Sequence, residues 1–130
     1  MLDHIEINVS DFARSRAFYQ SALAAIGYVP RKEVPTGIGF GADKLGDGDS
    51  PSGAFWIHPG TPSTPRVHVA FRARSRAEVD AFHRAALAAG GRDNGGPGVR
   101  PQYHPHYYGA FVLDPDGYNV ETVCHRAPSP

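Results

Sequence analysis

The chain has 130 residues, enough for one domain with its own hydrophobic core. Its 13 Lys and Arg balance 13 Asp and Glu, so we expect neither nucleic acid nor an anionic membrane as a partner. No apolar run approaches the ~20 residues that span a bilayer, and the N-terminus lacks a signal-peptide pattern. The single cysteine, Cys124, cannot form an internal disulfide, so we predict a cytoplasmic protein.

The first half of the chain has the patterns of strand, helix and three more strands. Residues 2–9 alternate between apolar and polar, which predicts a strand with one polar face. Ser10 or Asp11 can cap the helix that follows, and Gly27 ends it. Three further strands are expected at residues 28–34, 37–42 and 53–58.

The second half repeats this plan after a linker rich in proline and glycine. Ser75 and Glu78 form a capping-box pattern at the start of the second helix. The expected strands are residues 67–71, 92–99, 107–113 and 118–124, with a weak signal in the second of these. We therefore predict a single domain, residues 1–130, made of module one (1–58), a linker (59–65), module two (66–125) and a tail (126–130).

The two halves also match residue by residue at an offset of 64 positions. His4 falls on His68, Phe18 on Phe82, and the turn at 50–53 on the turn at 114–117, without a gap. Two copies of one supersecondary unit favour a pseudo-two-fold pair over a longer solenoid. The expected fold is α+β: two β-α-β-β-β modules that form a cupped, partly open, eight-stranded mixed sheet.

Three polar residues at equivalent positions of the repeat predict a metal site. His4 and His68 lie on the face opposite the helix-packing residues, so a two-fold axis would bring both imidazoles into the cup of the sheet. Glu121 lies in the last strand, and the gapless offset makes Ile57 its mate. Two histidines and one carboxylate are the composition of a facial triad, which leaves open positions on a divalent ion.

The loop before the last two strands contains further candidates for catalysis. His104 or His106 can act as a general acid or base, since imidazole titrates near neutral pH. Tyr107 or Tyr108 can donate a hydrogen bond to a metal-bound oxygen. The alternative is an aromatic surface loop at a dimer interface.

Five residues near the predicted triad are candidates for the wall of the cavity. Glu6 and Asn8 share the strand face of His4, and Glu6 is a candidate second base. Phe55 and Trp56 come directly before Ile57, and they either shape the substrate pocket or fill the core.

The motifs at 4–11, 16–19, 68–71 and 111–121 resemble the vicinal oxygen chelate superfamily, the group of glyoxalases, bleomycin-resistance proteins and extradiol dioxygenases. Its Asp-Pro-Asp-Gly-x-x-x-Glu ending stands at residues 114–121. The resemblance covers essentially the whole chain. It implies paired β-α-β-β-β modules around a metal, ligands at His4, His68 and Glu121, and a homodimer in which the site can be shared between subunits.

One departure from the pattern concerns the fourth ligand. Glyoxalase I proteins commonly have a second carboxylate in the fourth strand, where this chain has Ile57, so a four-ligand site is not expected. Three ligands resemble extradiol dioxygenases and thiol-transferring fosfomycin-resistance enzymes. Bleomycin-resistance proteins usually lack the ligands, so the triad disfavours that function.

These observations predict a divalent-metal-dependent enzyme of glyoxalase or dioxygenase kind. Its small-molecule substrate would chelate the ion through neighbouring oxygens, and the ion would act as a Lewis acid. The ligand set favours Fe(II), with Mn(II), Zn(II) or Ni(II) as alternatives. The alternative function is metal-free binding or sequestration of a small molecule. The residues do not distinguish among isomerase or lyase, dioxygenase and thiol-transferase chemistry.

Overall fold

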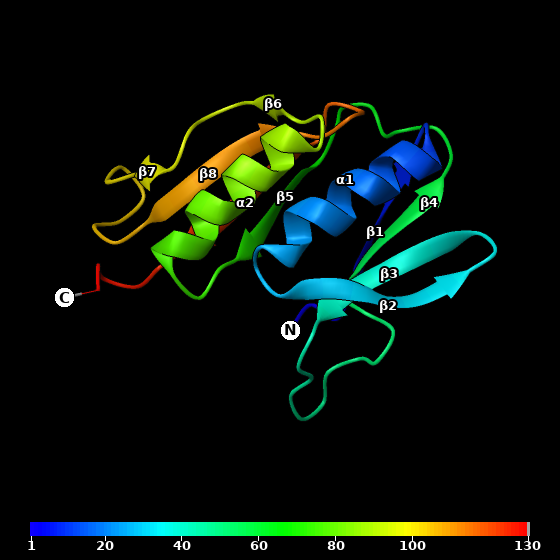
Figure 1. The fold of residues 1–130 in the computed structure, drawn as a ribbon, viewed down its shortest axis with the longest axis horizontal. Helices are drawn as coiled ribbons and strands as arrows, with labels where there is room; N and C mark the ends of the chain where they lie inside the picture. Colours follow the sequence, from blue (N-terminus) through cyan, green and yellow to red (C-terminus); the bar gives the residue numbers. More distant parts are fainter. Residues whose placement is uncertain (130) are drawn as a thin grey trace.

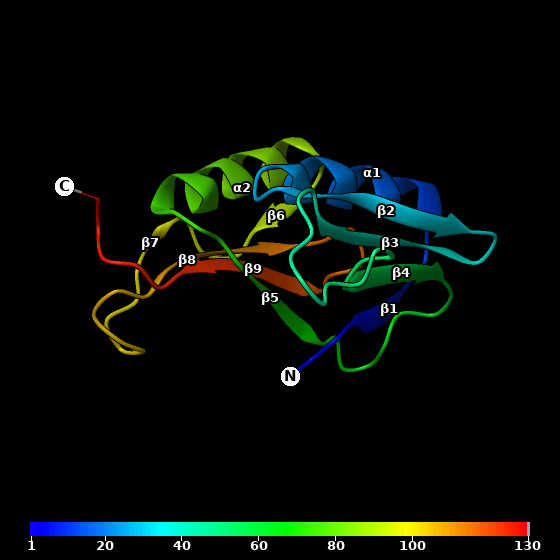
Figure 2. The same cartoon turned by 90° about the horizontal axis from the view of Figure 1, so that it is seen from below.

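The computed structural model describes residues 1–129. Two helices lie side by side on one side of the molecule, and the strands form the other layer (Figures 1 and 2). The predicted β-α-β-β-β repeat is confirmed. In module two the strand expected at residues 92–99 is divided into two short strands. In chain order the elements are β1 (Ile5–Val9), α1 (Phe12–Ala24), β2 (Tyr28–Val34), β3 (Gly37–Ala42), β4 (Phe55–Pro59), β5 (His68–Arg72), α2 (Arg76–Ala88), β6 (Arg92–Asp93), β7 (Gly98–Val99), β8 (Tyr108–Leu113) and β9 (Asn119–Cys124).

Each module builds its own sheet, so the expected open, mixed strand layer consists of a four-stranded and a five-stranded sheet and not of one continuous sheet of eight strands. Module one has the order β1-β4-β3-β2, and module two has β5-β9-β8-β6 with β7 also on β8. The first strand of each module pairs in parallel with the last, and the other pairs are antiparallel. The strand predicted at residues 92–99 is interrupted around Gly95, whose φ of 143° lies outside the range of an ordinary strand residue.

The helices are capped by short polar side chains. Asp11 accepts a hydrogen bond from the backbone N–H of Arg14, at 3.1 Å, and begins α1. Ser75 accepts from the N–H of Glu78, at 3.2 Å, and begins α2. Each cap satisfies an N–H that has no partner within the helix, so both helices begin where the sequence predicts.

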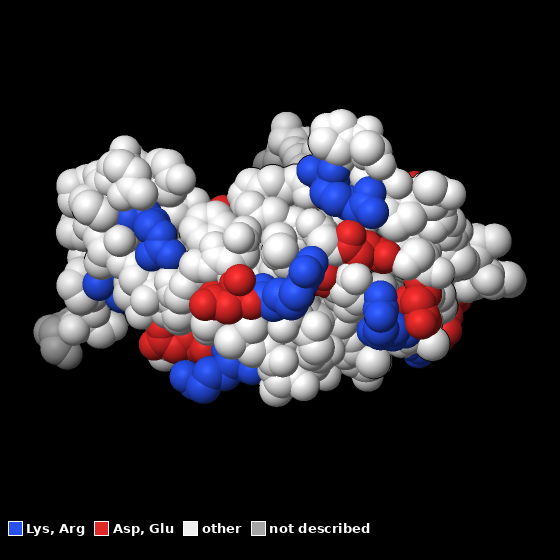
Figure 3. All heavy atoms as spheres, turned by 90° about the horizontal axis from the view of Figure 1, so that it is seen from above, with Lys and Arg blue, Asp and Glu red and all other residues white. Residues whose placement is uncertain are grey.

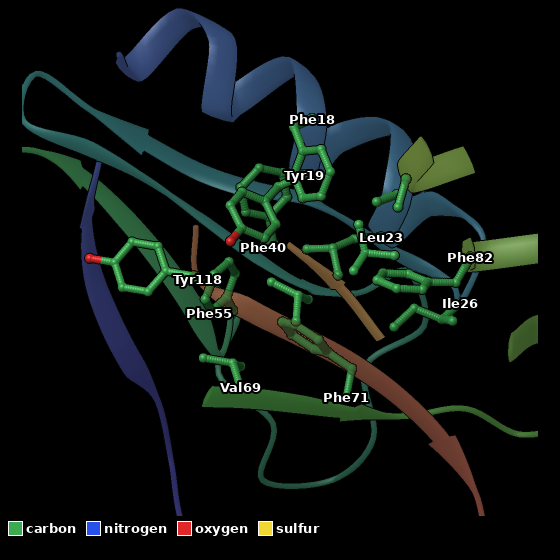
Figure 4. Packing of buried hydrophobic residues seen from close by; sticks show 14 of the residues in the cluster. Phe18, Tyr19, Leu23, Ile26, Phe40, Phe55, Val69, Phe71, Phe82 and Tyr118 are labelled. Carbon is green, nitrogen blue, oxygen red and sulfur yellow. The ribbon is translucent and has the colours of Figure 1, made fainter. Parts of the chain in front are cut away.

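The core lies between the helix layer and the sheets (Figure 4). Tyr19 of α1 contacts Phe18 and Phe55, with 4.9 Å between ring centroids in both pairs. Phe55 in turn meets Phe71 of module two edge to face at 5.2 Å. Because aromatic rings from both modules interlock, the two halves share one core.

The register of the last strands corrects the repeat by one residue. In module one Ile7 pairs with Ile57, whereas its repeat mate Phe71 pairs with Thr122. The offset is therefore 65 in the last strand, and the structural mate of Glu121 is Trp56. Since neighbouring residues of a strand point to opposite faces, Ile57 belongs to the helix side, where it is fully buried.

The surface carries both charges in mixed order. On the face in Figure 3, basic and acidic side chains lie next to one another without a large patch of one sign. Within residues 1–129, neither helix is long and apolar enough to cross a membrane.

Candidate functional site

The centre of the candidate site is a histidine and a glutamate on neighbouring parallel strands of module two. His68 begins β5 and Glu121 lies in the middle of β9. The Nε2 atom of His68 lies 2.8 Å from Oε2 of Glu121. The glutamate side chain is only 3% exposed, whereas the imidazole is 46% exposed. A buried carboxylate is therefore covered by one solvent-accessible imidazole.

The hydrogen bonds of His68 determine which of its nitrogens carries the proton. Nδ1 lies 3.0 Å from the backbone oxygen of Asn119, which can only accept, so Nδ1 carries a hydrogen. Nε2 of a neutral ring then presents a lone pair to the carboxylate of Glu121. Two lone pairs at this distance repel, so the arrangement requires a proton or another cation between them. A histidine whose Nδ1–H binds a backbone carbonyl is also the usual arrangement of a metal-ligating imidazole.

Tyr107 holds the other oxygen of the same carboxylate. Its hydroxyl donates a hydrogen bond to Oε1 of Glu121. Burial, together with this hydrogen bond, raises the pKa of Tyr107 far above its ordinary value, so the phenol remains a donor at neutral pH. A Cβ at Gly109 would lie 3.2 Å from the ring of Tyr107 and 3.3 Å from Oε1 of Glu121. Glycine in β8 thus leaves room for this contact.

These residues line a cavity of about 430 Å³ on the side of the sheet away from the helices. This volume is in the range of small-molecule sites. The ring of His68 stacks on Phe111 at 6.0 Å, and Tyr103 packs on Tyr107 at 4.8 Å. Six of the eight lining side chains have flat rings; the full set is His68, Tyr103, His104, Tyr107, Phe111, Asn119, Glu121 and His125. The cavity is therefore shaped for a flat ligand.

The two candidate histidines of the loop differ in their positions. His104 lines the cavity, and its Nε2 lies 2.8 Å from Nδ1 of His125. His106 is exposed, and it contributes its backbone N–H, which donates to Nδ1 of His104 at 3.1 Å. The imidazole of His106 is not among the groups that line this cavity.

Two further predicted residues lie away from this pair in the single chain. His4 precedes β1, not within it, and its Nδ1 lies 2.7 Å from Oδ1 of Asp3. It does not join His68 and Glu121: within residues 1–129, no three or more His, Cys, Asp or Glu side chains are placed to hold a metal ion. Tyr108 points to the helix side, where its hydroxyl donates to Asp80 of α2 at 2.7 Å.

The residues predicted from module one divide between the two faces of its sheet. Phe55 and Ile57 are buried in the core, so they do not line the cavity. Glu6 and Asn8 lie on the open face and line a separate hollow of about 310 Å³ beside Tyr118. Trp56 is also on the open face.

Trp56 stacks on His58, with 5.9 Å between the ring centroids and 10° between the planes. Nδ1 of His58 lies 2.7 Å from the backbone oxygen of Thr36, and its Nε2 lies 3.7 Å from Oε1 of Glu6. Nε2 is buried and has no hydrogen-bond partner. Module one therefore has a second histidine and glutamate near one another.

Several lining residues carry no recognisable signal in the sequence. Tyr103, Phe111 and Asn119 enter the cavity through their positions on the loop and on the open face of β8 and β9. His125 follows β9, and the sequence alone indicates only an ordinary residue at the end of a strand. Its partner His104 is 21 positions away, so only the folded chain reveals the pair.

The comparisons with known proteins agree with this architecture. Residues 1–122 match the model of the Glyoxalase/Bleomycin resistance protein/Dioxygenase superfamily, and the chain belongs to that superfamily. No curated protein matches the chain. The predicted family and the α+β fold are thus confirmed.

Solved structures from several bacteria share the fold along nearly the whole chain. A glyoxalase/bleomycin resistance protein from Albidiferax ferrireducens T118 is 27% identical, with 95% of this chain and 98% of that chain covered and a TM-score of 0.76. A lactoylglutathione lyase from Agrobacterium tumefaciens is 18% identical (95% and 92% covered, TM-score 0.64). A glyoxalase/dioxygenase from Nostoc punctiforme is 20% identical (98% and 92% covered, TM-score 0.66).

Proposed function

We propose that the protein is a divalent-metal-dependent enzyme that acts on a small substrate with neighbouring oxygen atoms. The observation that carries the proposal is the pair of His68 and Glu121. Nε2 and Oε2 face one another at 2.8 Å, and the hydrogen bond at Nδ1 leaves Nε2 without a proton in the neutral ring. A divalent cation satisfies both lone pairs, and imidazole and carboxylate are ordinary ligands of such ions.

The third ligand in this proposal is His4 of a second copy of the chain. His4 is the repeat mate of His68, its side chain is 50% exposed, and one chain does not bring it to the pair. In a symmetric homodimer, two ligands from one subunit and the third from its partner complete the triad twice, once with each subunit in each role. We therefore propose a homodimer with two shared sites.

The proposed chemistry assigns separate tasks to the residues around the pair. A bound ion would supply Lewis-acid stabilisation of negative charge on a substrate oxygen. Tyr107 holds Oε1 of Glu121 and so orients the other oxygen toward His68. Phe111 and Tyr103 provide flat walls that orient a planar substrate and exclude water. Fe(II) is the favoured ion, with Mn(II), Zn(II) or Ni(II) as alternatives.

A metal-free binding protein is the second candidate function. It is favoured by one observation, namely that the described part of a single chain assembles only two of the three proposed ligands. The ring-lined cavity would then hold a flat molecule by stacking and burial alone.

Metal content distinguishes these functions. Elemental analysis of untagged protein, purified with and without added Fe(II), Mn(II), Zn(II) or Ni(II), should give about one ion per chain in the wild type. The variants His4→Ala and His68→Ala should each lose the ion. His83→Ala removes an imidazole from α2, outside the cavity, and should keep it. Wild-type protein that binds none of these ions would favour the binding protein.

Mixing the two variants tests whether the site is shared. After His4→Ala and His68→Ala subunits are unfolded together and refolded, a mixed dimer has one site with both histidines intact and one site with neither. Ion binding should therefore return to about half of the sites in the mixed dimers. No recovery would contradict the shared site, while loss of the ion in both single variants would still support a metal site.

A further inference from the structure

Two imidazoles at the edge of the cavity form a pair that the proposed chemistry does not use. His104 comes from the loop before β8, and His125 follows β9. Nε2 of His104 lies 2.8 Å from Nδ1 of His125. Tyr107 packs edge to face against both rings, with centroid distances of 5.5 Å and 5.3 Å. The pair therefore has a fixed position beside the residue that holds Glu121.

The hydrogen bonds around the pair assign a proton to each ring. The backbone N–H of His106 donates to Nδ1 of His104, so that nitrogen carries no hydrogen. A neutral His104 must then carry its proton on Nε2, and this proton is donated to Nδ1 of His125. Because Nδ1 of His125 accepts, the proton of its own neutral ring is on Nε2.

The result is a directed chain from the loop backbone through His104 to His125. All nitrogens of the chain have a partner except Nε2 of His125, which carries a hydrogen and has no acceptor within residues 1–129. His125 is exposed, so solvent or a ligand can reach it. The pair thus presents one N–H donor at a definite place on the edge of the cavity.

The rest of the lining indicates what such a donor would bind. Glu121 is the only ionisable acid or base other than histidine and tyrosine among the lining residues, and it is occupied by His68 and Tyr107. Asn119 has one recorded side-chain hydrogen bond, in which its Oδ1 accepts from Nδ2 of Asn94 at 3.3 Å. A flat ligand that reaches from His68 to the edge of the cavity would therefore meet the N–H of His125 at its far end.

We propose that His125, oriented by His104, is a specificity-determining hydrogen-bond donor for a flat ligand that has a carboxylate or carbonyl oxygen remote from its chelating oxygens. The assignment rests on the proposed function, because it places the chelating end of the ligand at His68 and Glu121. His104 is a positioning residue in this account, because the proton on its Nε2 determines the tautomer of His125.

The tautomers are tested first, without a metal or a ligand. Long-range ¹⁵N–¹H correlation spectra of labelled protein at neutral pH should show His125 with a protonated Nε2 and an unprotonated Nδ1. In His104→Phe the donor to Nδ1 is absent, so the signals of His125 should move toward averaged tautomers. A wild-type His125 protonated on Nδ1 would overturn the proposal.

Binding of two probes then tests the specificity. Calorimetry under nitrogen on protein loaded with Mn(II) should show 3,4-dihydroxybenzoate bound about tenfold more tightly than catechol, which lacks the carboxylate. His125→Phe should abolish this preference, His125→Gln should retain most of it through the side-chain N–H, and His83→Phe should leave it unchanged. Equal binding of the two probes by the wild type would overturn the inference.

The two proposals fail in different ways. If metal-dependent catechol binding is observed without any preference for the carboxylate, the role of His125 is wrong and the metal site stands. If neither probe binds in a metal-dependent manner, the proposed chelation fails, and with it the ligand assignment of His125. In that case the tautomer spectra still establish whether the histidine pair itself is correct.

Discussion

The two modules share one topology but use the open faces of their sheets in opposite ways. In module one Trp56 and His58 stack on one another over part of this face, and only the separate hollow of about 310 Å³ beside Tyr118 remains. Module two leaves a cavity of about 430 Å³ in front of Glu121. The repeated fold thus provides two sheets with similar open faces. A few side chains determine which of these faces has room for a ligand.

Glycines in the neighbouring strands account for much of this difference. In β3 a Cβ at Gly37 would lie 2.4 Å from the ring of His58, and one at Gly39 would lie 2.5 Å from Trp56. Both rings therefore rest directly on the backbone of β3. In β8 the corresponding face has Gly109 and Phe111, which form the floor of the cavity and the space for Tyr107.

Both open faces also carry a histidine and a glutamate in the same diagonal relation across a parallel pair of strands. His68 pairs with Asn119, and Glu121 is two residues further along β9. Glu6 pairs with Trp56, and His58 is two residues further along β4. The nitrogen-to-oxygen distance is 2.8 Å in module two and 3.7 Å in module one. The same ladder geometry thus gives a tight pair only where a third residue, Tyr107, holds the carboxylate.

The largest expected effect on stability comes from a side chain that fills the space under Trp56. In Gly39→Ala the new Cβ would lie 2.3 Å from the backbone oxygen of Ser52 and 2.5 Å from the indole. Such overpacking should lower the free energy of unfolding by about 2–3 kcal/mol. Urea denaturation measures it. Gly96→Ala, with nothing within 4 Å of its Cβ, should change stability by less than about 0.5 kcal/mol.

A smaller difference in stability is expected between equivalent substitutions in the two helices. Tyr19 donates to the buried carboxylate of Asp114 at 2.5 Å, whereas its repeat mate His83 bonds to the exposed Asp93 at 3.0 Å. Tyr19→Phe would leave a buried oxygen without its donor and should cost about 2 kcal/mol. His83→Phe should cost less than about 1 kcal/mol. Thermal and urea unfolding of both variants measure the difference, and equal losses would contradict it.

The role of Tyr107 is tested by metal affinity. Tyr107→Phe removes the hydrogen bond that orients Glu121, so it should weaken binding of Mn(II) by about tenfold, as loss of a hydrogen-bond partner of a ligand does elsewhere. Glu6→Gln, on the open face of module one, should not change the affinity. Competition titration with a chelating dye measures both. Unchanged affinity in Tyr107→Phe would show that the carboxylate needs no orientation by the phenol.

The smallest expected effect is the pH dependence of the stability that Tyr107 contributes. Its pKa is raised in the folded state, so the phenol keeps its proton where the unfolded chain loses it, above about pH 10. Its stabilising contribution is complete below that pH and decreases as the pH rises toward the folded-state pKa. The stability of the wild type should therefore fall relative to Tyr107→Phe above about pH 10. A constant difference across pH 8–11 would contradict the raised pKa.

The sequence by itself determined the elements, the repeat and the family. Alternating strands, the caps at Asp11 and Ser75, and the glycine that follows each helix are local signals, and they need no knowledge of distant contacts. The sequence also predicts His68 and Glu121 as members of one site, because the repeat and the family motif at 111–121 single out both residues. Tyr107 and His104 were among the candidates of the loop.

Only the tertiary structure decided which residues meet. The register of β9 differs by one residue from that of β4, so Trp56, not Ile57, is the structural equivalent of Glu121. Such a difference exchanges the two faces of a strand without altering any local pattern. The partition into two sheets leaves His4 away from His68 in one chain. His125 meets His104 only because the loop before β8 folds back on the end of β9, a contact between distant segments that residue spacing does not encode.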